Sequence, residues 1–401
     1  MNAQGDFSVQ RIWIAPVFLL WITAVHAEEP AWINTAQVHG FLSQGFVLTS
    51  ANRFFGASHH GSLAFTEAGV NVSTRPYGPL LLSAQGLFRR SGEVSPKEFR
   101  LDYALADCAF WSGAQGRVGL LLGRVKNPLG LYNETRDVAF TRPTIFLPQS
   151  IYFDRTRNLG LSSDGGQFYG EYSTPWGEWS LRFALGWPNG VQDKEFERLV
   201  VGRNWPGRFK TRLSYLGRLT YESPQRAWRF AITGGKVRPR YDPKGANPFQ
   251  AGETTLVPVI FSLQYETEKF TLTGEYALRF LRLSGFGRFL PDRSDTGESY
   301  YLQAAYRILP RLELVGRYDV FFADRDDTSG RKFAALTGRP RHTRFARDFT
   351  VGVRWDLSSS WMLRAEYHRV DGTGWLPVSD NSDRDRQKNW HLFSLLVSFR
   401  F

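Results

Sequence analysis

Residues 393–401 read FSLLVSFRF, and this stretch decides the fold class. One side of a two-residue period carries Phe393, Leu395, Val397, Phe399 and Phe401. A strict period of two predicts a β-strand, because successive side chains of a strand point to opposite faces. A large aromatic residue gains little at position 401 of a water-soluble domain, where terminal residues are usually frayed. The stretch therefore predicts a strand with one continuous apolar face.

The same alternation recurs along the chain, for example over residues 213–221, 270–280, 312–320 and 351–357. In each segment, large apolar residues alternate with a second set that includes Arg, Glu or Asp. The segments are longer than the roughly 5–6 residues usual in soluble sheets, and they suit the roughly 9–11 residues of a tilted transmembrane strand. Charged residues on the second face indicate a wet lumen.

Marking every such segment predicts sixteen strands. They cover 35–46, 63–74, 79–90, 99–110, 115–124, 164–173, 178–187, 209–221, 226–236, 256–266, 269–282, 298–307, 310–323, 345–357, 360–370 and 389–401. The segment 115–124 is weak, and an error there would change the number to fourteen or eighteen. An even number within this range is typical of transmembrane barrels.

The connections between these strands alternate in length. Short turns such as 75–78, 174–177 and 267–268 alternate with long loops, of which 125–163 is by far the longest. This alternation is typical of an up-and-down antiparallel barrel with periplasmic turns and external loops. In hydrocarbon every backbone amide must be paired, so a membrane sheet must close on itself. We therefore expect an all-β transmembrane barrel, and a closed sheet of sixteen strands leaves an aqueous channel.

Residues 1–27 predict a signal peptide, which leaves 28–401 as the mature barrel. A polar stretch ending at Arg11 precedes an apolar run over 12–25, and Val25-His26-Ala27 supplies small residues at the cleavage positions. That run is shorter than the roughly 20 residues of a transmembrane helix. Export through the periplasm separates the chain from nucleic acid despite its net charge of +12, so we expect no nucleic-acid partner.

The segment 393–401 resembles the last strand of Gram-negative outer-membrane barrels, in which a terminal Phe after alternating apolar residues is a signal for the barrel-assembly machinery. The resemblance, to the porin class as a whole, implies that Phe401 and Phe399 form this assembly signal. It also implies a location in the cell outer membrane, contact with its lipid and lipopolysaccharide, and assembly as a homotrimer.

The loop 125–163, between the fifth and sixth strands, has the position of the constriction loop that folds into the channel of such porins. The acidic Pro-Glu-Phe-Gly motif usual in that loop is absent here. A loop of this length is usually functional. Its apolar residues predict a packing face rather than a solvated loop; they are Phe140, Ile145, Phe146, Leu147, Ile151, Tyr152 and Phe153.

Basic residues outnumber acidic ones in and beside this loop. The basic set, which we predict to line the channel and set its selectivity, is Arg124, Lys126, Arg136, Arg142, Arg155 and Arg157, and the acidic set is Glu134, Asp137 and Asp154. These cations would either contact solutes directly or pin the loop to wall carboxylates. The candidate wall carboxylates are Asp102, Glu171, Glu275, Glu313, Asp319 and Glu366. A basic constriction favours anions.

These features predict a porin for ion transport and passive diffusion of small hydrophilic, preferentially anionic solutes. The sequence contains no His-Glu-x-x-His, Gly-x-Ser-x-Gly or phosphate-binding Gly-rich motif, and it has one Cys. We therefore expect no enzyme activity, no cofactor and no metal site. The alternative is an outer-membrane enzyme or adhesin that uses the barrel as a scaffold, and ion conductance would distinguish the two.

Overall fold

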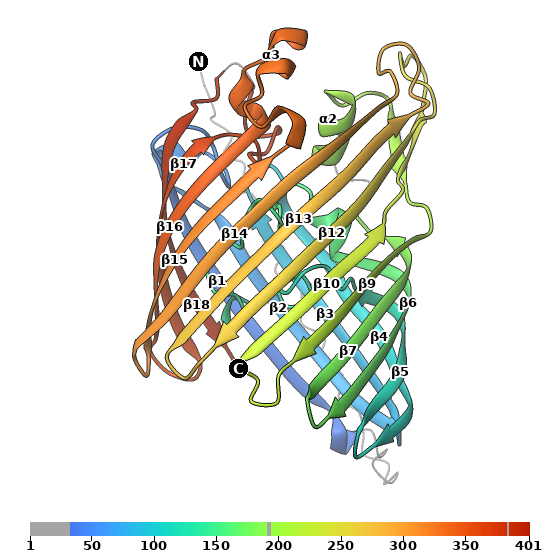
Figure 1. The fold of residues 1–401 in the computed structure, drawn as a ribbon, viewed down its shortest axis with the longest axis vertical. Helices are drawn as coiled ribbons and strands as arrows, with labels where there is room; N and C mark the ends of the chain where they lie inside the picture. Colours follow the sequence, from blue (N-terminus) through green and yellow to red (C-terminus); the bar gives the residue numbers. More distant parts are fainter. Residues whose placement is uncertain (1–32, 191–193, 383–384) are drawn as a thin grey trace, which may run out of the picture.

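The computed structural model describes residues 33–190, 194–382 and 385–401; the predicted signal peptide, 1–27, lies outside them. Within these ranges the chain forms a closed antiparallel barrel of sixteen wall strands (Figure 1). Long loops gather at the upper end of the barrel and short turns at the lower end. None of the helices in the described ranges is long and apolar enough to span a membrane.

The first half of the wall consists of β1 (Gln37–Thr49), β2 (Ser62–Tyr77), β3 (Leu80–Ser91), β4 (Ser95–Gly113), β5 (Gly116–Lys126), β6 (Ser162–Thr174), β7 (Gly177–Pro188), β8 (Gly207–Lys210) and β9 (Ser214–Glu222). The second half consists of β10 (Trp228–Lys236), β11 (Arg240–Pro243), β12 (Glu253–Glu266), β13 (Phe270–Ser284), β14 (Arg293–Leu309), β15 (Leu312–Phe322), β16 (Phe345–Asp356), β17 (Trp361–Gly372) and β18 (Asn389–Arg400).

The helices lie in the connections, with one short turn before the first strand. They are α1 (Arg157–Leu161), α2 (Lys194–Val201) and α3 (Arg331–Thr337), with 3-10 turns η1 (Ile33–Thr35), η2 (Ser58–His60), η3 (Ala139–Thr141), η4 (Arg325–Asp327) and η5 (Arg341–Arg344). The helices α2 and α3 lie at the loop end of the barrel (Figure 1).

The eighteen strand segments make sixteen wall strands because two wall strands are interrupted. The segments β8 and β9 follow one another along the chain, and they pair with β11 and β10, respectively. Each pair of segments is therefore one wall strand with a short break, at 211–213 and at 237–239. The prediction of sixteen strands is confirmed, and the weak segment 115–124 is β5.

The barrel closes between its first and last strands. The strands β1 and β18 pair from Phe41 opposite Arg400 to Thr49 opposite Leu392. The backbone of Phe401 extends this ladder, since its N–H donates to Gly40 O at 3.0 Å and its carbonyl accepts from Gly40 N at 3.2 Å. The Phe401 ring occupies the place that a Cβ on Gly40 would need. Closure leaves the sheet without an open edge.

The wall exposes apolar side chains on its outside. On β18, Phe393, Leu395 and Val397 are 37%, 43% and 43% exposed, whereas the alternate residues Leu392 and Leu396 are buried. Aromatic residues add exposed rings near the turn end of the wall, namely Trp179, Trp228, Trp355 and Trp361. An apolar outer band with aromatic residues at its border is the surface that a lipid bilayer covers.

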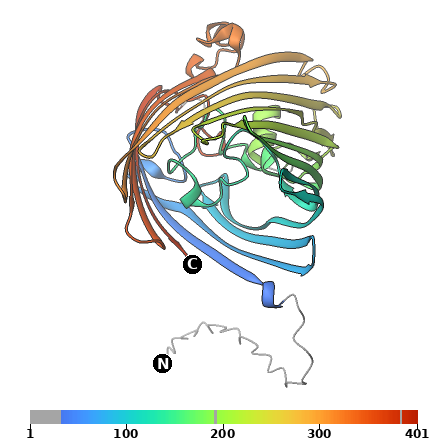
Figure 2. The same cartoon turned by 60° about the horizontal axis from the view of Figure 1, so that its bottom comes forward.

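Much of the inside of the barrel is filled by an apolar core, which we call the lumen core. It lies against β1, β2 and β15–β18, and it contains Phe54, Phe55, Phe65, Phe140, Ile145, Phe146, Phe321, Met362, Trp375, Leu376, Trp390 and Leu396. Several of these residues come from loops that fold inward, so the lumen is solid on this side. Figure 2 shows the segment after β5 crossing the inside of the barrel.

Candidate functional site

The segment 127–161, between β5 and β6, folds into the barrel (Figure 2). We call it the inward loop; the prediction of a constriction loop at 125–163 is confirmed, apart from two residues at each end that belong to the strands. Its apolar residues pack as predicted. Ile145 and Phe146 are buried in the lumen core, and the Phe146 ring centre lies 5.2 Å from that of Phe54.

Wall carboxylates hold the backbone of the inward loop. The Glu366 carboxylate of β17 accepts from the N–H groups of Ile145 and Phe146. On β13, Glu275 accepts from Leu131 N at 3.1 Å and from the Tyr152 hydroxyl at 2.6 Å. These carboxylates therefore fix the loop, which is one of the two roles that the sequence left open for the charged residues.

A buried charge cluster joins the inward loop to β2–β5. Its cations are Arg89, Arg100, Lys126, Arg136, Arg142 and Arg157, and its carboxylates are Glu67, Asp102, Asp137 and Asp154. Lys126 Nζ lies 2.5 Å from Asp102 and also contacts Asp137, which in turn contacts Arg157. Truncating one partner of such a buried pair typically costs about 3–5 kcal/mol.

The structure brings four of the six predicted cations into this cluster, namely Lys126, Arg136, Arg142 and Arg157. Sequence analysis missed Glu67 and Arg89, although both lie on predicted strands and are directly opposite each other in the β2–β3 ladder. The signal that could have found them is the two-residue period, which puts Glu67 and Arg89 on the lumen-facing sides of their strands. The excess of cations over carboxylates in the cluster gives the loop region a positive charge.

Arg124 lies apart from the other predicted residues. It shares the outward register of β5 with the exposed Leu122, and its Nε lies 2.8 Å from the Asp164 carboxylate of β6. Asp164 also lies on an outward position, in register with the exposed Phe168. Arg124 is therefore part of an ion pair with Asp164, and it also lines a polar cavity together with Arg100 and Glu195.

Arg155 lies outside the ion pairs of the charge cluster, although it lines the same cavity as Arg136 and Arg157. Its guanidinium lies 5.4 Å from the Phe153 ring and 5.8 Å from the Phe321 ring. Burial lowers the pKa of Arg155 to about 10, and burial likewise lowers the pKa of Arg136 to about 10. Both side chains are therefore cations at neutral pH.

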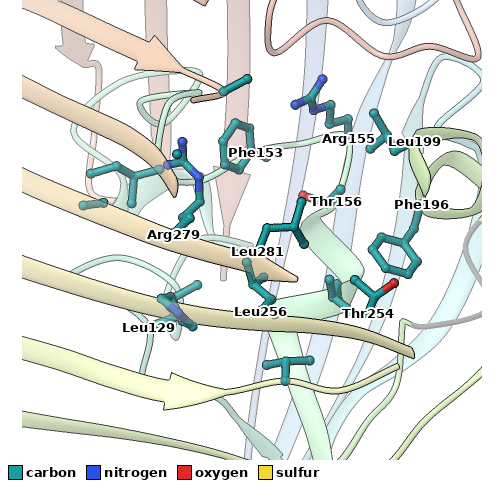
Figure 3. A pocket seen from close by; sticks show the side chains of 18 of the residues that line it. Leu129, Phe153, Arg155, Thr156, Phe196, Leu199, Thr254, Leu256, Arg279 and Leu281 are labelled. Carbon is teal, nitrogen blue, oxygen red and sulfur yellow. The ribbon is translucent and has the colours of Figure 1, made fainter. Parts of the chain in front are cut away.

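A cavity of about 280 Å³ lies between the inward loop, α2 and the inner face of β12–β14 (Figure 3). We call it the lumen cavity. Its apolar lining includes Phe153, Phe196, Leu199, Leu256 and Leu281, and its charged lining includes Arg155 and Arg279. Sequence analysis did not anticipate it, because Leu256 and Leu281 take inward positions that the strand pattern assigns to polar residues.

Helix α2 is fixed over the cavity by a loop from the other side of the barrel mouth. The buried Glu195 carboxylate accepts from Val378 N at 2.6 Å and from Ser379 N at 2.8 Å. This contact turns Phe196 and Leu199 towards the lumen cavity. Among the described residues, no three His, Cys, Asp or Glu side chains form a group that could hold a metal ion.

No protein-family model matches this chain, and no curated protein is similar to it in sequence. Solved structures are similar in fold. OmpT of Vibrio cholerae, expressed in the outer membrane, has a TM-score of 0.57 at 11% identity, over 91% of this chain and 97% of that one. The outer-membrane channel DcaP of Acinetobacter baumannii has a TM-score of 0.56 at 11% identity, over the same two shares.

A third solved structure is the anion-selective porin from Comamonas acidovorans, with a TM-score of 0.52 at 12% identity over 92% of this chain and 99% of that one. At such identities the likeness concerns the fold alone. The chain thus has the sixteen-strand barrel fold of outer-membrane porins, as the resemblance of its C-terminal segment implied.

Proposed function

We propose that the chain forms an outer-membrane channel through which small hydrophilic solutes diffuse passively, with a preference for anions. The observation that carries this proposal is the closed wall, apolar outside, around a charged interior into which the longest loop folds. A wall that exposes Phe393, Leu395 and Val397 requires a lipid environment. The loop, which buried charges hold in place, then narrows the lumen without blocking it.

The same observations support the predicted location of the protein in the outer membrane and its predicted partners there. The exposed apolar band and its Trp residues suit outer-membrane lipid, and the charged long loops suit the lipopolysaccharide layer. Assembly through a C-terminal signal at Phe399 and Phe401 is consistent with the Phe401–Gly40 closure. One solved structure of Vibrio cholerae OmpT is described as a trimer form, and we propose a homotrimer here also.

The anion preference is supported by two cations at the lumen cavity. Within the described part of the chain, neither Arg155 nor Arg279 has a carboxylate within ion-pair distance. By contrast, the wall carboxylates Glu275 and Asp319 are buried beneath the inward loop, where its backbone N–H groups bind them. The accessible charge is therefore positive, and a narrow passage between low-dielectric walls concentrates ions of opposite sign.

The alternative of a barrel enzyme or adhesin gains no support from a specific feature of the described residues, and we propose no catalytic role. Conductance in planar lipid bilayers tests the channel, and the reversal potential across a KCl gradient tests the preference. We expect discrete conductance steps and a reversal potential of the sign set by chloride. An absence of conductance from the folded protein would contradict the channel; a potential set by potassium would contradict only the preference.

Charge-reversal variants for this measurement must spare the loop anchors. Replacing Lys126 and Arg136 with Glu would place like charges against Asp102, Asp137 and Asp154, which would release the loop as well as change selectivity. Arg279→Glu changes a cation that has no carboxylate within ion-pair distance among the described residues, but it also removes the hydrogen bond from Arg279 to Ser150 O of the inward loop, so Arg279→Gln is its control. We expect Arg279→Glu to shift the reversal potential towards that of potassium.

A further inference from the structure

Part of the inner face of β12 and β13, towards the loop end of the barrel, is apolar where a channel wall is expected to be wet. Inward positions on these strands carry Leu256, Pro258, Ile260, Leu281 and Leu283, and all five line the lumen cavity. Outward positions on the same strands carry exposed residues such as Phe261 and Phe280. A strand that is apolar on both faces meets lipid on one side and an apolar partner on the other.

The inward loop and α2 supply the rest of this apolar surface. Leu129 and Ile151 come from the inward loop, and Phe196 and Leu199 come from α2 (Figure 3). Phe196 and Leu283 belong to one packed apolar cluster, against which Leu129, Leu256 and Leu281 also pack, and a cavity of about 280 Å³ lies beside it. Protein interiors rarely leave such space between apolar side chains, since filling it gains dispersion energy. The cavity is therefore shaped for an apolar body.

One side of the cavity is cationic. The guanidinium groups of Arg155 and Arg279 both lie against the rings of Phe153 and Phe321, at 5.1–5.8 Å from the ring centres. Arg279 donates to Ser150 O at 3.1 Å, Ser299 Oγ at 2.7 Å and Phe322 O at 3.3 Å, all neutral acceptors. Two cations against the same pair of rings repel each other, and an anion between them would relieve the repulsion.

The carboxylate in the cavity lining does not pair with these cations. Asp295 lines the cavity, but its partner is Arg293 at 3.5 Å. Two polar groups of the cavity lining also remain without a hydrogen-bond partner among the described residues, namely Arg155 Nε and the Thr254 hydroxyl. Thr254 is 1% exposed, so its hydroxyl lies beneath the surface of the cavity.

We propose that the lumen cavity binds an amphipathic organic anion, such as an aromatic carboxylate, on its way through the barrel. The carboxylate lies between Arg155 and Arg279, and the apolar body lies against Leu256, Leu281 and Phe196. This inference rests on the proposed channel function and names the class of solute. A compact inorganic anion contacts only the cationic side of the cavity, so the site binds solutes that have both a carboxylate and an apolar body more tightly.

The test measures ligand binding to the folded protein in detergent by calorimetry, which does not depend on conductance. The probes are 3-phenylpropionate, acetate (the charge without the body) and 3-phenylpropanol (the body without the charge). We expect saturable binding of 3-phenylpropionate at least about tenfold tighter than that of either other probe. Equal affinity for acetate, equal affinity for 3-phenylpropanol, or no binding of 3-phenylpropionate would overturn the proposal.

Variants separate the two halves of the site. Arg155→Gln and Arg279→Gln should each weaken 3-phenylpropionate binding about tenfold, and Arg279→Lys should recover part of the loss. Leu281→Gln should weaken 3-phenylpropionate and leave acetate unchanged. The matched control is Arg307→Gln, on an inward position near the turn end of β14, and it should bind as the wild type does.

The folding of each variant is checked by its heat-modifiable gel mobility. If an Arg→Gln variant does not fold, the affinities of Leu281→Gln and Arg279→Lys test the proposal instead. Unchanged affinity in a folded Arg279→Gln or Leu281→Gln protein would overturn the proposal. Conductance without selective 3-phenylpropionate binding would refute this inference and leave the channel function standing. Selective binding without any conductance would refute the channel function instead.

Discussion

Arg142 Nη2 lies 2.7 Å from Glu67 Oε2, and this buried ion pair fixes the middle of the inward loop to β2. The same carboxylate accepts from Arg89 Nε at 3.2 Å, across the β2–β3 ladder. Glu67 therefore neutralises one cation of the wall and one of the loop. Together with Glu275 and Glu366, it holds the loop against the wall.

Glu67→Gln should destabilise the barrel by about 3–5 kcal/mol, because it leaves Arg89 and Arg142 buried without their shared carboxylate. Chemical unfolding followed by tryptophan fluorescence measures the change. Glu178→Gln is the control, since its exposed pair with Arg226 is worth at most about 1 kcal/mol. Equal stability of the two variants would show that Glu67 does not anchor the loop.

The loop 373–388 should dock more firmly in acid than in mild base. Burial raises the pKa of Asp380 from 3.8 to about 7, with Glu195 and Glu93 nearby and Arg53 opposing the effect. Because the pKa is raised in the docked state, the favourable contribution is complete below the unfolded pKa and is lost as the pH rises through about 7.

Hydrogen exchange of the loop 373–388 measures this dependence. We expect slower exchange, corrected for the intrinsic rate, at about pH 5 than at about pH 8. Asp380→Asn should abolish the difference, since its side chain keeps an oxygen to accept from Glu93 N and cannot ionise. A pH dependence that persists in this variant would assign the effect to another group.

Replacing Phe401 with Asp should reduce assembly in the outer membrane while export to the periplasm continues. The change places a charge where the Phe401 ring lies over Gly40, at the closing contact of the barrel. The amount of heat-modifiable barrel in outer-membrane fractions measures assembly. Phe401→Tyr, which keeps the ring, should assemble normally, and a normal amount of barrel from the Asp variant would refute the assembly signal.

Trp390→Ala should cost about 3–5 kcal/mol, as large-to-small changes of buried Trp usually do. Trp390 is buried in the lumen core, where its ring centre lies 5.4 Å from that of Trp375 and its Nε1 donates to Gly372 O. Trp355→Ala, on the outer face, is the control. In denaturant titrations we expect a clearly larger loss for Trp390→Ala, and similar losses would contradict a packed interior.

The wall was predictable from the sequence because two simple rules govern it. A period of two fixes each strand, and alternating short and long connections fix their order, so even β5 lay within a residue or two of its predicted bounds. The same rule does not decide the position of Arg124, because Lys126 lies on the same alternate set of β5 as Leu122 and Arg124 and is nevertheless part of the buried charge cluster.

The interior was less predictable because a loop has no period. Arg155 and Arg157 are two residues apart and both line the lumen cavity, yet only Arg157 pairs with a carboxylate of the charge cluster. Only contacts with distant strands, such as Phe321 for the first and Asp137 for the second, determine this. The apolar inner positions Leu256 and Leu281 were missed for a different reason, since the pattern expects one apolar face in each strand.

Because the lumen core fills one side of the barrel, substitutions at inward positions have different effects on the two sides of the wall. Inward positions on β15–β18 obey the volume rules of a soluble core, where a lost methylene costs stability. Inward positions on β12 and β13 such as Leu256 and Leu281 line the lumen cavity, so a change of size or polarity there alters the cavity as well as the packing. Among proteins that descend from this chain, substitutions that change the preferred solute should therefore lie mainly on β12 and β13. The inward residues of β15–β18 should stay the same.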